Sequence, residues 1–221
     1  MKIFLFRILN MLTGLFLYAL GIVLTIKANI GYGPWEVFHV GIAKQTGMSI
    51  GVVSIIIGIV IVVIVTLFNE KFGFGTLASM IVTGLLIDMI IEVDFIPIVS
   101  DIAFGIALLI AGLFIISLGS YFYMKTSFGV GPRDNLMVVL ARKTAIPVGI
   151  CRGIIELSVT IIGWLLGGMV GIGTVIAGFA IGFCVEITFA LFKFDATAVR
   201  HETLKQTFLA IKELLMKGRD L

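Results

Sequence analysis

The chain has 221 residues, of which 60% are hydrophobic and only 13% are charged, and its formal net charge is +3 at pH 7. Soluble domains carry roughly 25% charged residues, and here the apolar residues form long runs, so the composition is typical of a membrane protein. The small net charge and the lack of a basic block with interleaved aromatic residues argue against nucleic-acid binding. Cys151 and Cys184 lie far apart within apolar runs, which predicts two buried thiols and neither a disulfide nor a metal site.

The apolar runs predict six membrane-spanning helices, because each holds roughly 17–23 mostly apolar residues and a hydrocarbon core is about 30 Å thick. The predicted spans are residues 5–26, 50–68, 75–92, 102–124, 148–166 and 172–192. Two further segments, 34–45 and 132–143, contain charged residues and are too short to cross. Each begins with a proline that follows a glycine, which predicts a capped half-helix. These half-helices either lie in the interface or re-enter the bilayer.

One motif occurs twice, as Gly31-Tyr32-Gly33-Pro34 and as Gly129-Val130-Gly131-Pro132. The two copies lie 98 residues apart, and with this shift residues 14–88 align with residues 112–186 without a gap. Of the 75 aligned pairs 21 are identical, and nine of these are glycine or proline. Backbone-breaking residues in a fixed register indicate a duplicated unit. Three spans per unit is an odd number, so the second unit enters the membrane from the opposite side. The predicted fold is all-α, a polytopic membrane protein with two inverted three-helix repeats.

The predicted membrane domain covers residues 1–194, with one repeat over about 5–92 and the other over about 102–192. If the N-terminus is cytoplasmic, 14 of the 16 Lys and Arg residues lie on the cytoplasmic side and two lie outside, which agrees with the positive-inside rule. If the two short segments also crossed, eight spans would run as parallel repeats and the split would be 12 to 4. The sequence therefore favours six spans with both termini cytoplasmic, Lys44 outside, and Lys71 and Arg142 inside.

Glycines recur at helical spacing along three spans and predict faces where helices approach closely. They are Gly14 and Gly21 in the first span, Gly105, Gly112 and Gly119 in the fourth, and Gly178 and Gly182 in the sixth. The tail, residues 195–221, differs in composition. Its apolar residues Leu204, Phe208, Ile211 and Leu215 fall at helical spacing, which predicts an amphipathic helix on the cytoplasmic face.

The Gly-Tyr-Gly-Pro-Trp-Glu stretch at 31–36, the Gly-Phe-Gly-Thr turn at 73–76 and six spans in some 220 residues resemble the YczE/YyaS/YitT-like group of bacterial integral membrane proteins. The chain is most similar to the YczE-like branch, and the resemblance extends to about residue 192. It implies a multi-pass protein of the bacterial plasma (inner) membrane and brings no catalytic residues with it. In the second copy Arg133-Asp134-Asn135 replaces Trp35-Glu36-Val37, which argues against both motifs binding the same group.

The two glycine–proline motifs are the candidate binding site, because a half-helix that follows such a turn presents free N–H groups and a positive dipole end. In transporters with inverted repeats, such broken helices meet near the membrane midplane and hold substrate. The candidate substrate-binding residues are Gly31, Gly33, Pro34, Glu36, Gly129, Gly131, Pro132 and Asp134. If both turns re-enter, they converge near Glu186. The alternative is that they only cap interfacial helices, about 30 Å apart.

Four charged residues inside predicted spans are candidates for proton or ion coupling, because charges at this depth usually face a cavity or a partner. They are Asp88, Arg152, Glu156 and Glu186. Asp88 and Glu186 occupy equivalent positions in the two repeats. Arg152 and Glu156 are four residues apart and predict an ion pair on one helix face. The alternative for all four is a purely structural pairing.

These features predict a small secondary transporter or permease for a small polar, zwitterionic or anionic solute. The first alternative is a non-transporting membrane partner or assembly factor that docks cytoplasmic proteins through residues 199–221, and an intramembrane enzyme comes third. No hydrolase, zinc-protease or phosphate-loop motif is present, so no enzyme activity, cofactor or metal site is predicted. The expected partners are the lipid bilayer and a small-molecule solute, and the sequence also leaves room for a homo-oligomer.

Overall fold

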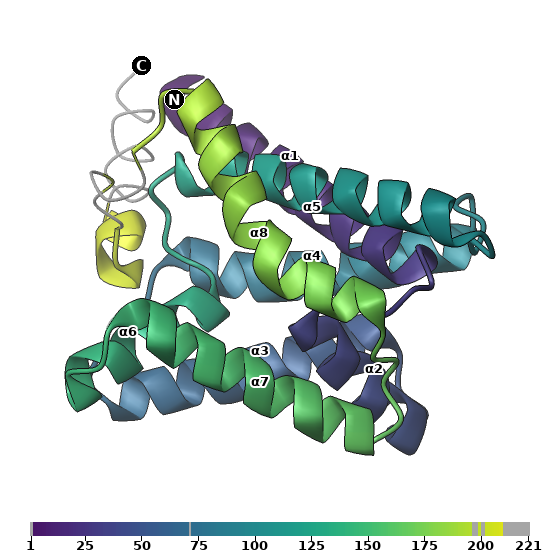
Figure 1. The fold of residues 1–221 in the computed structure, drawn as a ribbon. Helices are drawn as coiled ribbons and strands as arrows, with labels where there is room; N and C mark the ends of the chain where they lie inside the picture. The colour runs from purple at the N-terminus through teal and green to yellow at the C-terminus, as the bar shows by residue number, and fades with distance from the viewer. Residues whose placement is uncertain (1, 71, 196–198, 200–201, 210–221) are drawn as a thin grey trace.

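The computed structural model describes residues 2–70, 72–195, 199 and 202–209, and within them every regular element is helical. Besides a short helix over residues 204–209, eight helices follow in chain order (Figure 1): α1 (Lys2–Lys27), α2 (Pro34–Thr46), α3 (Ile50–Leu67), α4 (Phe74–Val93), α5 (Ile102–Met124), α6 (Pro132–Thr144), α7 (Val148–Leu165) and α8 (Ile172–Leu191). They match the six predicted spans and two predicted half-helices to within a few residues. The all-α prediction is therefore confirmed for the described part of the chain.

Five helices in the described residues are long and apolar enough to cross a membrane, namely α1, α3, α4, α5 and α8. The sixth predicted span coincides with α7, which has 18 residues and carries Arg152 and Glu156. It is not among the five. The fold thus has the character of a multi-pass membrane protein, and the sixth span stays a prediction.

The helices form two groups that face each other (Figure 1). The upper group contains α1, α4, α5 and α8, and the lower group contains α2, α3, α6 and α7. In the upper group α1 packs most extensively on α5. The lower group has its own apolar core around Trp35, Ile61, Val65 and Val139. Between the groups α3 packs along α4, whereas α7 does not pack closely on α8.

Glycine contacts hold α1 against α5 in antiparallel directions. Gly14 lies against the Gly119 carbonyl and Gly21 against the Gly112 carbonyl, so the predicted packing faces of these two helices are present. The prediction was wrong for Gly178 and the neighbouring Gly182 of α8. No heavy atom outside the local helix backbone lies within 4 Å of a Cβ built at either position, because α7 stands away from α8.

The two halves of the chain turn at equivalent backbone positions. Residues with a positive backbone φ occur in pairs 98 residues apart: Asn29 and Ser127, Gly31 and Gly129, Gly47 and Ala145, and Asn69 and Gly167. Asparagine and glycine tolerate this conformation well, whereas alanine does so at a cost. The second half thus keeps the turn even where its sequence has lost the favourable residue.

Each half of the chain also contacts the other through backbone hydrogen bonds at its glycine turns. The Gly75 amide at the start of α4 donates a hydrogen bond to the Phe128 carbonyl at 2.8 Å, and the Gly173 amide at the start of α8 donates one to the Ile30 carbonyl at 2.8 Å. Donors and acceptors in the two bonds are related by the same 98-residue offset. Because glycine has no side chain, the chain before each half-helix approaches the opposite helix start closely.

Part of the tail contacts the membrane domain. Glu202 forms an ion pair with Arg7 at 2.6 Å and its amide donates to the Ser127 carbonyl, while the Leu204 amide donates to the Phe72 carbonyl. Residues 204–209 are helical, in agreement with the predicted tail helix. The rest of that prediction, including Ile211 and Leu215, lies outside the described residues, as does the predicted cytoplasmic position of Lys71.

Candidate functional site

A cavity of about 170 Å³ lies between the two helix groups, and all eight helices line it. Both half-helix starts face it, with Gly33 and Pro34 from α2 and Gly131 and Pro132 from α6. Each glycine is the N-cap and each proline the first helical residue, as predicted. The two turns therefore converge on one cavity. The alternative, in which they only cap helices on opposite membrane surfaces, does not describe this arrangement.

Arg133 joins the two half-helices across the cavity. Its guanidinium lies 3.4 Å from the Glu36 carboxylate, 3.5 Å from His39 Nδ1 and 4.8 Å from the centroid of the Trp35 ring. The sequence offset pairs Arg133 with Trp35, so an arginine of one half stacks on the aromatic residue that it replaces in the other. The divergence between the motifs thus makes them complementary partners.

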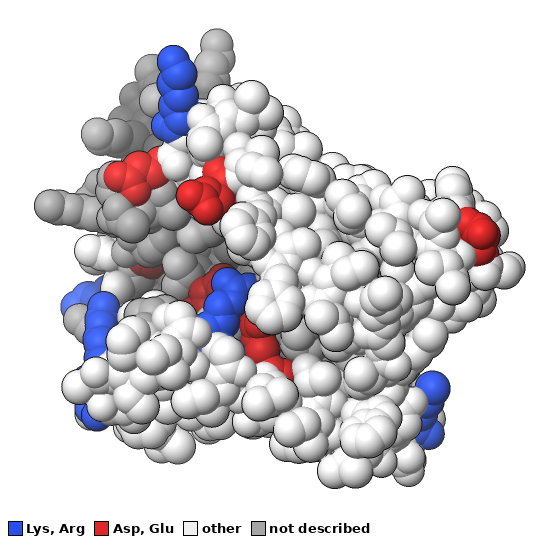
Figure 2. Space-filling model, in the orientation of Figure 1, with Lys and Arg blue, Asp and Glu red and all other residues white. Residues whose placement is uncertain are grey.

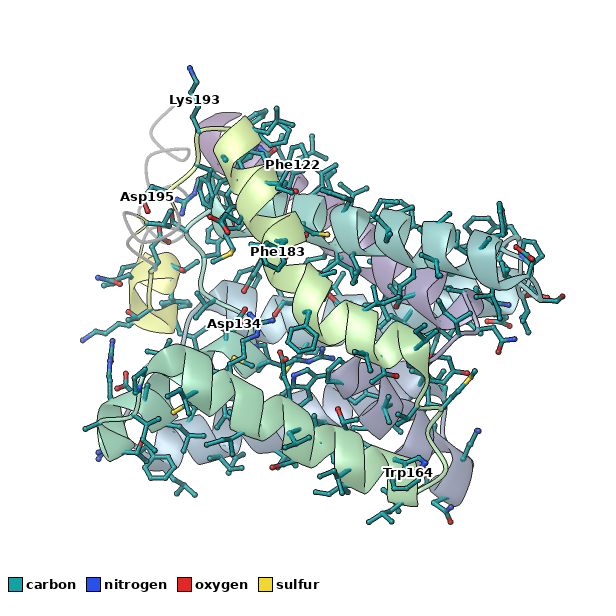
Figure 3. All side chains as sticks on the ribbon, viewed as in Figure 1. Phe122, Asp134, Trp164, Phe183, Lys193 and Asp195 are labelled. Atoms are coloured by element: carbon teal, nitrogen blue, oxygen red, sulfur yellow. The ribbon has the colours of Figure 1, made fainter. Side chains whose placement is uncertain are left out.

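Further along the cavity wall, Arg152 and Glu156 of α7 form the predicted ion pair at 2.8 Å. Asp134 lies in the middle of the molecule (Figure 3), and its side chain is nevertheless exposed because it faces the cavity. Among the described residues it has no ion-pair or hydrogen-bond partner. The wall therefore carries three carboxylates, including Glu36, against two guanidinium groups, an excess of one negative charge.

Two buried polar atoms in the cavity wall lack a hydrogen-bond partner among the described residues: His39 Nε2 and the Tyr123 hydroxyl oxygen. His39 is only 2% exposed and Tyr123 only 7%. Ser79 lies beside Tyr123, and its oxygen can accept from the Tyr123 hydroxyl while its own proton is donated to the Thr76 carbonyl, so His39 Nε2 is the atom that more clearly lacks a partner. Buried polar groups are nearly always hydrogen-bonded in proteins, so such atoms point to a ligand or water.

Four of the predicted site residues do not line the cavity. Gly31 packs against Gly171 and Thr174, and Gly129 packs against Thr76, so both serve the contacts between the repeats. Asp88 accepts hydrogen bonds from the Ser49 hydroxyl and from the Gly51 amide. This places it on the α3 N-terminus. Glu186, by contrast, is exposed on α8, and the predicted proximity of the turns to Glu186 is not found.

Sequence reasoning missed most of the aromatic and histidine residues of the cavity wall. Tyr18, Trp35, His39 and Tyr123 all face the cavity. A signal was present for His39, which lies three residues after Glu36 and so on the same face of the half-helix. For Tyr18 and Tyr123, which lie within long apolar runs, no local pattern separates a cavity face from a lipid face.

The cavity opens on the side where α7 and α8 stand apart. Figure 2 shows this face, with acidic and basic side chains gathered in a hollow at its middle. On the opposite side α3 and α4 close the cavity: a Cβ at Gly84 would lie 2.5 Å from Ile55 Cγ1 and 2.7 Å from the Gly51 carbonyl. At the equivalent positions of the second half, Gly149 and Gly182, no such neighbour lies within 4 Å.

Asp88→Ala is expected to lower the free energy of unfolding by about 1–2 kcal/mol, because it removes a carboxylate that caps the start of α3 and leaves the Gly51 amide without its acceptor. The matched control is Glu186→Ala, because Glu186 occupies the equivalent position of the second repeat and its side chain is exposed. This variant should change the free energy of unfolding by less than about 0.5 kcal/mol. Thermal melts of both variants in detergent check the difference. Equal losses in the two variants would contradict the capping role.

The helices and the central cavity, which is mainly apolar with five charged side chains in its wall, together define the class: a multi-pass α-helical membrane protein. The chain belongs to the family of unknown function DUF6198, whose model matches residues 5–189.

Three relatives support this assignment. The chain is 33% identical to "Uncharacterized membrane protein YczE" of Bacillus subtilis over 79% of this chain and 81% of that protein. It is 32% identical to an uncharacterized protein of Haemophilus influenzae over 80% of each chain. It is 26% identical to "Uncharacterized protein YyaS" of Bacillus subtilis over 74% of this chain and 82% of that protein. The expected resemblance to the YczE-like branch is confirmed. No solved structure matches the chain.

Proposed function

We propose that the protein is a small secondary transporter of the bacterial plasma membrane that works by alternating access. It has six spans, two inverted repeats and cytoplasmic termini, and it catalyses no chemical reaction. The observation that carries this proposal is the asymmetry around the cavity. The α3–α4 pair is closed and the equivalent α7–α8 pair is open.

Inverted repeats explain why such an asymmetry points to transport. If two equivalent helix pairs adopt both arrangements, exchanging them produces a second state in which the cavity opens on the other side. The antiparallel packing of α1 on α5 supports the inversion. So do the half-helices, because α2 and α6 lie at opposite ends of the molecule (Figure 1). Near the end of α2 Lys44 donates to the Gly167 carbonyl, and at the equivalent position of α6 Arg142 pairs with Glu70.

Glu186 has a defined part in this exchange. In the closed pair Asp88 caps the N-terminus of α3. In the open pair the N-cap of α7 is Pro147, which supplies no side-chain hydrogen bond, and Glu186 is exposed on α8 with no ion pair to any described residue. Closure of α7 on α8 brings Glu186 to the amides at the start of α7, where a carboxylate is stabilising. Glu186, which the sequence predicts to take part in ion coupling, thus stabilises the closed state of the α7–α8 pair.

Disulfide trapping tests the closure without knowledge of the substrate. The double variant Gly149→Cys/Gly182→Cys is made after Cys151 and Cys184 have been replaced by alanine, and membranes are treated with a mild oxidant. A disulfide forms only when the Cα atoms come within about 7 Å of each other. The proposal predicts cross-linking that grows with time, because the open and closed states exchange.

A second double variant controls for the oxidation itself. The Tyr32 amide donates to the Met169 carbonyl at 3.1 Å, which holds the two Cα atoms within about 7 Å of each other, so Tyr32→Cys/Met169→Cys is expected to cross-link promptly. If this control pair reacts while positions 149 and 182 never do, the α7–α8 gap is a fixed feature and the transporter proposal fails.

A further inference from the structure

We infer that the cavity binds a small solute with a cationic nitrogen and, on another part of the same molecule, a hydrogen-bond acceptor. Amino acids and amino alcohols are the simplest members of this class. The inference rests on the proposed function, since it names the substrate class of the same cavity. It narrows the expectation of a small polar, zwitterionic or anionic solute, and three features of the wall carry it.

The first feature is Asp134. The other charges of the wall are paired with one another, Glu36 with Arg133 and Glu156 with Arg152. Asp134 has no ion pair of its own among the described residues and shares the field of Arg152 and Arg133 with their carboxylate partners, so the wall keeps an excess of one negative charge. An unpaired charge inside a membrane-embedded wall is costly. A cationic nitrogen on the solute neutralises it, whereas a solute with only negative charge is repelled.

The second feature is the free hydrogen-bond donor of His39. Arginine has no acceptor, so the contact of Arg133 with Nδ1 requires that Nδ1 accepts. In the neutral ring the proton is then on Nε2, the atom without a partner. A buried donor that stays unpaired costs about 1–3 kcal/mol. An acceptor on the solute, such as a carboxylate or a hydroxyl oxygen, removes this cost.

The third feature is the closeness of these two groups. Asp134 follows Arg133 directly in the chain, and Arg133 touches His39. The side chains of Asp134 and His39 also line the same cavity, so one small solute in it can contact both groups. The aromatic rings of Trp35 and Tyr18 also face the cavity, and aromatic faces attract cations. A cavity of about 170 Å³ is also small beside the ~300–1,000 Å³ of pockets for drug-sized ligands.

Three solutes with one carbon skeleton separate the contributions: leucine, which has both groups, isopentylamine, which has only the cation, and 4-methylpentanoate, which has only the carboxylate. Thermal melts of the purified protein are recorded with each, and the same set is repeated on the skeletons of alanine and phenylalanine. We expect the amino acids to raise the melting temperature most, the amines less, and the carboxylates not at all.

Two conservative variants assign the effect to named groups. Asp134→Asn is expected to weaken binding of the amino acid and of the amine at least tenfold, because it removes the charge and keeps the shape. His39→Phe is expected to abolish the advantage of the amino acid over the amine. Glu92→Gln, which removes an exposed carboxylate of α4 outside the cavity, is the control and should bind as the unmodified protein does.

The inference is overturned if the carboxylates stabilise as well as the amino acids, if no amine-bearing member of the set stabilises, or if Asp134→Asn responds as the unmodified protein does. A lipid headgroup has the same chemistry as a free amine, and the gap opens between two helices. Melts in phosphatidylglycerol nanodiscs with and without phosphatidylethanolamine distinguish the sources, since a headgroup ligand stabilises without added solute. Cross-linking between positions 149 and 182 needs no ligand, so the transporter proposal can stand when this inference falls.

Discussion

Gly112→Leu is expected to lower the melting temperature of the purified protein by more than ordinary surface substitutions do. A Cβ at this position would lie 2.9 Å from the Gly21 carbonyl, 2.9 Å from Thr25 Cγ2 and 3.2 Å from Leu24 Cβ. The backbone of α1 cannot move away without opening the largest helix contact of the molecule. Overpacking of this kind costs typically about 1–3 kcal/mol and sometimes more.

The chain offers a matched control for this substitution. Gly178 also lies on a spanning helix, and no heavy atom outside the local helix backbone lies within 4 Å of a Cβ built there. Gly178→Leu should therefore leave the melting temperature nearly unchanged in detergent. If the two leucine variants melt together with the unmodified protein, the close approach of α1 and α5 does not stabilise the fold.

Gly182→Leu is expected to leave the protein folded and to block closure of α7 on α8. Its Cβ meets open space in this structure, whereas in the exchanged state it would meet α7, as Gly84 now meets α3. Thiol labelling at the cavity residue Ser120 reports the block. With Ser120→Cys in a background without native cysteines, a membrane-impermeant reagent should react from both sides of the membrane.

After Gly182→Leu has been added, the same reagent should react from the cytoplasmic side only, with the rate from outside lowered at least tenfold. Gly84→Leu is the informative counterpart, because its side chain would collide with Ile55 and the Gly51 carbonyl and should destabilise the fold. Unchanged labelling from outside in the Gly182→Leu variant would show that access does not depend on closure of this pair.

The elements of this fold could be read from the sequence because the signals that specify them are local. Apolar runs of membrane length predict spans, and proline after glycine predicts the start of each half-helix. The duplicated motif around Gly33 and Gly131 was equally visible, because residues that fix backbone turns are retained in register. The same locality explains the ion pair of Arg152 with Glu156, which lie four residues apart on one helix.

The wall of the cavity could not be read in this way, because its contacts join residues far apart in the chain. Arg133 reaches Glu36 and His39 only after the two half-helices have converged. Nothing in the apolar runs distinguishes Tyr123, which faces the cavity, from aromatic residues that face lipid. Burial, pairing and the loss of a partner are properties of the assembled helices.

The two repeats show which features follow from the sequence and which depend on the tertiary structure. By its sequence the chain determines two similar units with glycines at Gly51 and Gly84 and again at Gly149 and Gly182. Asp88 and Glu186 likewise occupy equivalent positions and carry the same charge. Only the tertiary structure decides that Asp88 is hydrogen-bonded to a helix start and that Glu186 is exposed. The reason is physical: the equivalent residues provide similar local signals in both halves, and whether a helix pair packs depends on contacts with helices that are distant in the chain.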